Sequence, residues 1–140
     1  MADLLKLYAG TAVVFFAIDL VWLGVVAQGF YERQIGFLLA EDVRWGAALL
    51  FYAIYIAGIL VFAVLPGLEA DSLTRTAALA AFLGFFAYAT FDLTSLALFE
   101  GFPTRVVIVD LAWGTVLTTA VASAGFGIGR WLGMGPSAGV

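Results

Sequence analysis

Long apolar runs dominate the chain, and short polar stretches separate them. Four of the runs are long enough to cross a bilayer as a helix, which takes about 20 mainly apolar residues. They are rich in Ala and Leu and lack the alternation of apolar and polar residues that a strand of a membrane β-barrel requires. The pattern therefore predicts four transmembrane helices, at about residues 4–27, 43–65, 73–99 and 103–131.

The connections between these runs differ in length and character. Residues 28–42 mix aromatic and charged side chains, which is typical of a segment at the membrane interface. Pro66-Gly67 ends the second run, and a short polar turn follows it. The glycine-containing tail, about residues 133–140, is predicted to be disordered. We therefore expect one integral membrane domain over residues 1–140, an all-α bundle of four helices.

Composition supports a membrane protein and excludes several kinds of chemistry. Hydrophobic residues make up 64% of the chain and charged residues 11%, whereas soluble domains carry about 25% charged residues. The net charge of −4 provides no basic patch, so nucleic acid is not an expected partner. Without histidine or cysteine the usual metal and haem ligands are missing, and Lys6 is the only lysine. We expect no metal and no cofactor.

One phrase occurs twice in the chain. Residues 42–50 read DVRWGAALL and residues 110–118 read DLAWGTVLT, and in each half an Asp-Leu pair, at Asp19 or Asp92, comes earlier. The repeat predicts two tandem helical hairpins related by a pseudo-two-fold axis along the membrane normal. The alternative is that two unrelated membrane hairpins converged on Gly, Trp and Asp, with the tryptophans as interfacial anchors. The repeat assigns four residues to helix entries: Asp42, Trp45, Gly46 and Gly114.

Acidic residues gather toward one face of the membrane. Asp19 and Asp92 lie a few residues past the middle of the first and third predicted helices, and Asp110 precedes the middle of the fourth. A carboxylate at membrane depth is costly and normally faces the interior of the bundle. We therefore predict a polar pocket open toward this face, formed by Asp19, Trp22, Tyr88, Asp92, Thr94, Ser95, Asp110, Trp113 and Thr118.

Structural roles compete with this functional interpretation. Asp92 could be a structural acid bonded to a tyrosine, threonine or arginine, and Asp110 could pair with an arginine one and a half turns earlier. Asp42 suits the start of a helix, where carboxylates are favoured. We assign Tyr52 and Tyr55 of the second helix to the core rather than to the pocket.

Several of these motifs together resemble a known family. FDLTSLAL at 91–98 and VDLAWG at 109–114 follow FAIDLVWLG at 16–24 and FYAIYIAGILVFAVLPG at 51–67. The chain resembles the small bacterial membrane-protein family of unknown function numbered 2177, over nearly its whole length. The resemblance implies a compact inner-membrane protein of four helices. It implies no established activity, so no catalytic role is assigned to any residue.

Three functions remain open at this point. The first is a protein that binds or handles a lipid or amphiphilic small molecule in the one-sided acidic pocket. The second is a small proton-coupled transporter of cationic or amphiphilic substrates, and the third is an accessory subunit of a membrane complex. An enzyme is the less favoured interpretation, because the sequence shows no nucleophile or cofactor motif. Expected partners are membrane lipids, with a homodimer or a membrane-protein partner as further options.

The positive charges do not decide the orientation in the membrane. Three basic residues fall on each side, with Lys6, Arg75 and Arg130 opposite Arg33, Arg44 and Arg105. The positive-inside rule is therefore balanced. The amino terminus itself favours the cytoplasmic side, which places the acidic face outside.

Overall fold

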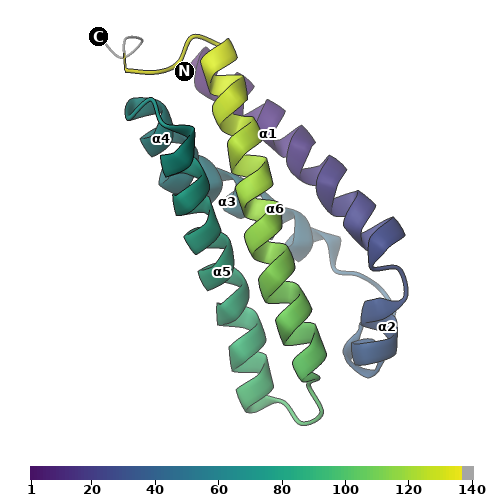
Figure 1. Cartoon of the computed structure of the whole chain (residues 1–140). Helices are drawn as coiled ribbons and strands as arrows, with labels where there is room; N and C mark the ends of the chain where they lie inside the picture. Colours follow the sequence, from purple (N-terminus) through teal and green to yellow (C-terminus); the bar gives the residue numbers. More distant parts are fainter. Residues whose placement is uncertain (137–140) are drawn as a thin grey trace.

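The computed structural model describes residues 1–136, and these form helices joined by short connections, with no strand among them (Figure 1). Four helical spans are long and apolar enough to cross a membrane, which confirms the predicted all-α, four-span fold. In chain order the elements are α1 (Ala2–Val21), π-helical η1 (Trp22–Val26), α2 (Phe30–Ile35), 3-10 helical η2 (Gly36–Leu38), α3 (Trp45–Ile59), π-helical η3 (Leu60–Val64), α4 (Leu65–Glu69), α5 (Leu73–Leu98) and α6 (Thr104–Trp131).

Helices α5 and α6 form a close antiparallel pair (Figure 1). A Cβ atom at Gly84 of α5 would overlap the backbone carbonyl oxygen of Gly114 on α6, and one at Gly114 would overlap the Tyr88 ring. Small residues at such positions let two helix backbones approach within the membrane. The glycines therefore set the short separation of this pair.

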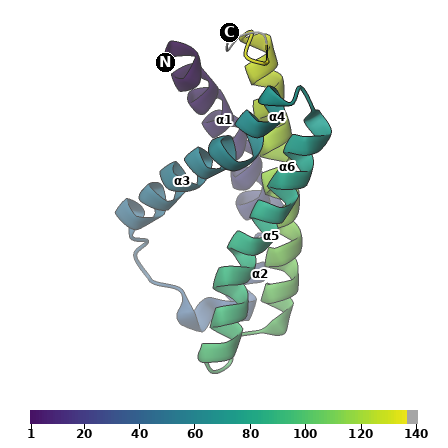
Figure 2. The same cartoon turned by 90° about the vertical axis from the view of Figure 1, so that its left-hand side faces the viewer.

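Helices α1 and α3 meet through bulky side chains instead. The Phe15 ring lies edge-on to Tyr52 and Tyr55, with centroids 5.6 and 6.1 Å away, and Phe16 lies 5.2 Å from Tyr52. Aromatic rings at the crossing keep the two backbones apart. Figure 2 shows α3 leaning away from the line of α5 and α6.

The second span continues beyond its predicted end at residue 65. Pro66 is the second residue of α4, and the helix runs on to Glu69. The π-helical segment Leu60–Val64 precedes it. Widening of a helix in this way relieves the clash between a proline ring and the preceding turn. Pro66-Gly67 therefore continues the second helix, and the expectation that it ends the helix is corrected.

The connection between α4 and α5 is a tight, well-capped turn. Asp71 adopts a positive φ of 50°, and the Ser72 hydroxyl accepts a hydrogen bond from the Arg75 N–H at the start of α5. Arg130 near the end of α6 forms an ion pair with Asp71. After α6, the Gly133 N–H donates to the Arg130 carbonyl and the Met134 N–H to the Gly129 carbonyl, so these two residues cap the helix. Of the tail predicted to be disordered, residues 137–140 lie outside the described residues.

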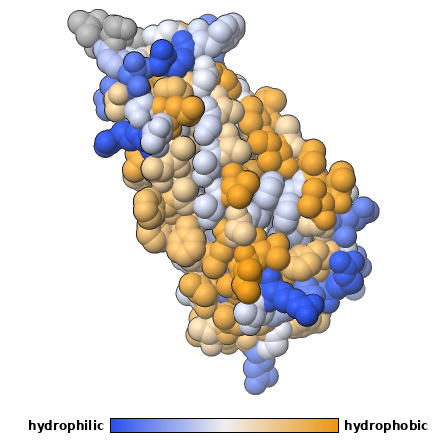
Figure 3. Space-filling view, in the orientation of Figure 1, coloured by the Kyte–Doolittle hydropathy of each residue, from blue (hydrophilic) through white to orange (hydrophobic). Residues whose placement is uncertain are grey.

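The surface has the distribution of polarity expected of a membrane protein. Figure 3 shows an apolar band across the middle of one face, with hydrophilic residues gathered toward both ends. Large apolar side chains such as Phe62, Phe82 and Val116 are exposed along the spans. Helices α1 and α5 run in one direction, while α3–α4 and α6 return in the other (Figure 1). The chain is therefore built to cross a bilayer four times.

Candidate functional site

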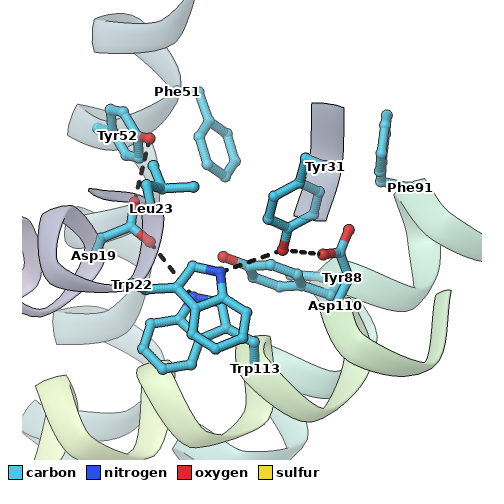
Figure 4. Close-up of a pocket in the computed structure, with 11 residues that line it drawn as sticks. Asp19, Trp22, Leu23, Tyr31, Phe51, Tyr52, Tyr88, Phe91, Asp110 and Trp113 are labelled. Carbon is cyan, nitrogen blue, oxygen red and sulfur yellow. Dashed lines mark hydrogen bonds between the residues drawn. The ribbon is translucent and has the colours of Figure 1, made fainter. Parts of the chain in front are cut away.

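A cavity of about 460 Å³ lies between the splayed helix α3 and the rest of the bundle. Every span contributes to its wall, and the short helix α2 closes one side (Figure 4). The wall is mainly aromatic, with two carboxylates. Its lining consists of Asp19, Trp22, Leu23, Tyr31, Phe51, Tyr52, Ala87, Tyr88, Phe91, Asp110 and Trp113.

Asp19 reaches the cavity from α1 and is only 8% exposed. Its carboxylate accepts hydrogen bonds from the Tyr52 hydroxyl at 3.3 Å and from the Trp113 indole N–H at 3.4 Å. Both distances exceed the usual range of 2.5–3.2 Å. The carboxylate is therefore oriented by two neighbours but is weakly satisfied by them.

Two tryptophans form the floor of the cavity. The indole rings of Trp22 and Trp113 stack with centroids 4.2 Å apart and an angle of 8° between their planes. The Trp22 N–H donates to the Tyr31 hydroxyl at 3.2 Å, and that hydroxyl donates to the Asp110 carboxylate at 2.6 Å (Figure 4). Hydrogen bonds and ring stacking therefore connect Asp19, through the two indoles and Tyr31, to Asp110.

Tyr31 enters this network because the chain folds back after η1. Gly29 adopts a positive φ of 81°, a conformation that favours glycine, and α2 begins directly after it. Burial raises the pKa of the Tyr31 phenol, and the hydrogen bond to Asp110 raises this pKa further. The phenol therefore stays protonated and keeps donating to Asp110.

Asp92 belongs to α5, lies behind Asp110 of α6 and is completely buried. Neither of its carboxyl oxygens receives a hydrogen bond from the N–H or O–H groups of residues 1–136. Asp110 is an acidic neighbour of Asp92. Among the described residues, no lysine or arginine pairs with Asp19, Asp92 or Asp110, and the ion pair that does form joins Arg130 to Asp71. The site therefore gathers acids without a cation of its own.

The structure brings together five of the residues predicted for the pocket. Asp19, Trp22, Tyr88, Asp110 and Trp113 all line the cavity. The two acids come from α1 and α6, and the other three are aromatic residues from η1, α5 and α6.

Four other predicted pocket residues are not part of the cavity lining, and one of them is the buried Asp92 of α5. Thr94 is exposed, and its hydroxyl donates to the Thr90 carbonyl of its own helix. Ser95 is buried but is not part of the lining. Thr118 is buried and shares a hydrogen bond of 2.7 Å with Tyr55, which joins α6 to α3.

The residues assigned to helix entries occupy unequal surroundings. Asp42, Trp45 and Gly46 are exposed, and they do not line the cavity. A Cβ atom at Gly46 would meet nothing within 4 Å, whereas Gly114 is packed against Tyr88. The two copies of the phrase therefore occupy different environments in the fold.

Several lining residues were missed from the sequence. The sequence pattern places Tyr31 in an interfacial connection and Tyr52 in the core, and it singles out neither Phe51 nor Phe91, although all four line the cavity. The cluster of aromatic residues in the segment after Asp19 is a sequence signal for this aromatic lining. The described residues contain no group of His, Cys, Asp and Glu side chains arranged to hold a metal ion.

The four spans and the cavity at membrane depth define the chain as a multi-pass integral membrane protein. Residues 4–127 match the family described as predicted membrane protein (DUF2177), so the chain belongs to this family. The match confirms the family resemblance seen in the sequence motifs. No curated protein and no solved structure matches the chain.

Proposed function

We propose that this membrane protein binds an amphiphilic, lipid-like molecule drawn from the bilayer. The observation that carries the proposal is the cavity of about 460 Å³, which combines an acidic, hydrogen-bonded wall with an exposed apolar rim. Its volume falls within the roughly 300–1,000 Å³ of small-molecule sites. It suits a polar head group and the first part of a hydrocarbon chain.

The rim supplies the apolar half of this match. Leu23, Phe51 and Phe91 line the cavity and are 45%, 50% and 59% exposed. Phe51 belongs to α3 and Phe91 to α5, so the mouth lies between these two helices. A chain leaving the cavity there passes over apolar side chains into the lipid.

The wall supplies the polar half. Asp19 and Asp110 both line the cavity, and the indole and phenol groups that bond to them fix their carboxylates in place. Because side chains at membrane depth meet little water, a ligand head group gains more from such groups here than at a wet surface. A head group at the wall and a chain at the rim therefore match the two halves of an amphiphile.

We also propose a cellular membrane and an orientation for the protein. The family resemblance and the four apolar spans support a bacterial inner membrane. The amino terminus is proposed to lie in the cytoplasm, which turns the acidic end of the bundle outward. Addition of a reporter enzyme to each terminus tests this placement independently of the ligand.

The test is native mass spectrometry of the protein released from its own membrane. Wild type is expected to carry a defined additional mass. Ala87→Phe fills the cavity from α5 and is expected to lose that mass, whereas Ala78→Phe adds the same ring at an exposed site on the same helix and keeps it. Wild type with no bound amphiphile, or equal retention by both variants, would overturn the proposal.

A further inference from the structure

We infer that the head group of the bound amphiphile is a methylated ammonium cation. This inference rests on the proposed function and names the class of ligand for the same cavity. Three features of the site support it: acids without a cation, a wall of aromatic rings, and wall carboxylates that already accept hydrogen bonds.

The first feature is the charge of the site. Asp19, Asp92 and Asp110 are each at most 9% exposed, and none pairs with a lysine or arginine in residues 1–136. A buried charge is costly unless an opposite charge or hydrogen bonds compensate for it. A ligand with a positive head group provides the missing charge directly beside Asp19 and Asp110.

Asp92 strengthens the charge argument because it is a fully buried acid without a donor. Asp110 is an acidic neighbour of Asp92 and lines the cavity. Of these two acids, Asp110 is the one that presents its carboxylate at the wall. That carboxylate lies opposite Asp19, so the cavity is bounded by carboxylates on two sides (Figure 4).

The second feature is the aromatic wall. The rings of Trp22, Trp113, Tyr31, Tyr52 and Tyr88 line the cavity, and Phe51 and Phe91 complete it at the rim. The face of an aromatic ring attracts a cation, most strongly for tryptophan, and cages of such rings recognise quaternary ammonium groups. The wall therefore suits a charged group that is large and weakly hydrated.

The third feature distinguishes a methylated ammonium from a primary one. A primary ammonium is strongly hydrated and carries three N–H donors that need acceptors. The wall carboxylates already hold donors from Tyr52, Trp113 and Tyr31, and the remaining side-chain acceptors of the lining are tyrosine hydroxyls. A trimethylammonium group has no N–H to satisfy, and its methyl groups contact the rings.

The experiment compares three probes of equal chain length on the protein in maltoside micelles. Dodecyltrimethylammonium carries the proposed head group. Dodecyldimethylamine oxide has a similar shape without net charge, and dodecylammonium is the primary amine. Binding is followed by isothermal titration at pH 8 and by tryptophan fluorescence, to which Trp22 and Trp113 of the cavity contribute together with Trp45 and Trp131. We expect the trimethylammonium probe to bind at least about tenfold more tightly than the amine oxide.

Variants link the preference to the acids. Asp19→Asn and Asp110→Asn are each expected to weaken binding of the trimethylammonium probe about tenfold and to leave the amine oxide nearly unchanged. Asp42→Asn removes an exposed acid outside the cavity and serves as the matched control. Variants that elute as wild type in size-exclusion chromatography count as folded.

The outcomes separate this inference from the proposed function. Equal binding of the charged and uncharged probes, lost together in Ala87→Phe, overturns the methylated-cation inference and leaves amphiphile binding intact. Tighter binding of dodecylammonium also overturns it. If none of the three probes binds, the proposed function falls as well.

Discussion

The pair α5–α6 and the pair α1–α3 cross the same bilayer in the same directions, yet the first is closed and the second is open (Figure 2). Gly84 and Gly114 let α5 and α6 approach until backbone meets side chain. The rings of Phe15 and Phe16 pack edge to face with Tyr52 where α1 crosses α3. The size of the side chains at the crossing decides whether a helix pair closes or leaves room for a ligand.

The doubled Trp-Gly phrase shows the same contrast at the level of single residues. In α6, Trp113 stacks on Trp22 and Gly114 packs on Tyr88. In α3, Trp45 is exposed and Gly46 has free space around it. One copy of the phrase thus contributes to the closed pair and to the floor of the cavity. The other begins a helix that leans away from the bundle.

Removal of Phe15 is expected to have the largest effect on this contrast. Phe15 is buried at the crossing of α1 and α3, so Phe15→Ala leaves a void between them and costs about 3 kcal/mol of stability. Unfolding in mixed micelles of maltoside and dodecyl sulfate measures the change. Phe82→Ala removes a ring that is exposed on α5 and is expected to be nearly neutral. Equal losses in the two variants would show that the crossing is not packed as described.

Crowding of the closed pair is expected to have the next largest effect. Gly84→Ala places a methyl group against the Gly114 carbonyl and Thr118, which forces α5 and α6 apart and costs about 2 kcal/mol. The same unfolding assay measures this loss of stability.

Two other glycines provide matched controls for this substitution. Gly127→Ala in α6 and Gly46→Ala in α3 add the same methyl group where nothing lies within 4 Å. Since alanine favours the helix, both are expected to be neutral or to stabilise by up to about 1 kcal/mol. A loss in Gly46→Ala as large as that in Gly84→Ala would remove the distinction between the two pairs.

A smaller effect is expected where the open helix is tied to the closed pair. Thr118→Val removes the hydroxyl that shares a buried hydrogen bond with Tyr55 and is expected to cost about 1 kcal/mol. Thr119→Val is the control, because the Thr119 hydroxyl donates to the Thr115 carbonyl of its own helix. An unchanged unfolding midpoint in Thr118→Val would mean that this bond does not hold α3.

The last effect is absent at neutral pH and is confined to alkaline pH. The pKa of Tyr31 is raised in the folded protein. The contribution of Tyr31 to the free energy of unfolding is therefore complete below about pH 10 and is lost as the pH rises toward the pKa of the folded protein. The stability of wild type is expected to fall above pH 10 by up to about 1.4 kcal/mol per pH unit more steeply than that of Tyr31→Phe. Parallel slopes for the two proteins would contradict a protonated Tyr31 bound to Asp110.

Much of the fold follows from the sequence because apolar length alone dictates spans in a bilayer. The four spans were predicted, and so was the gathering of Asp19 and Asp110 toward one end. Burial at membrane depth explains why these acids turn inward, and this reasoning needs no knowledge of the neighbours.

The missed residues depend on geometry that periodicity does not encode. Tyr31 reaches Asp110 only because the chain turns at Gly29 and folds α2 back against the bundle. Tyr52 reaches the cavity because α3 leans outward, which follows from the rings packed at its crossing with α1. A run of apolar residues fixes the existence of a span but not its tilt.

The central claim is that the opening between α3 and α5 holds the amphiphile. Photolabelling tests this claim most directly. A dodecyltrimethylammonium probe with a diazirine in its chain is reacted with the protein in maltoside micelles, and labelled peptides are mapped by mass spectrometry. We expect labelling centred on the rim residues Leu23, Phe51 and Phe91. Labelling spread equally over Phe62, Phe82 and Val116, which are just as exposed elsewhere on the spans, would contradict it.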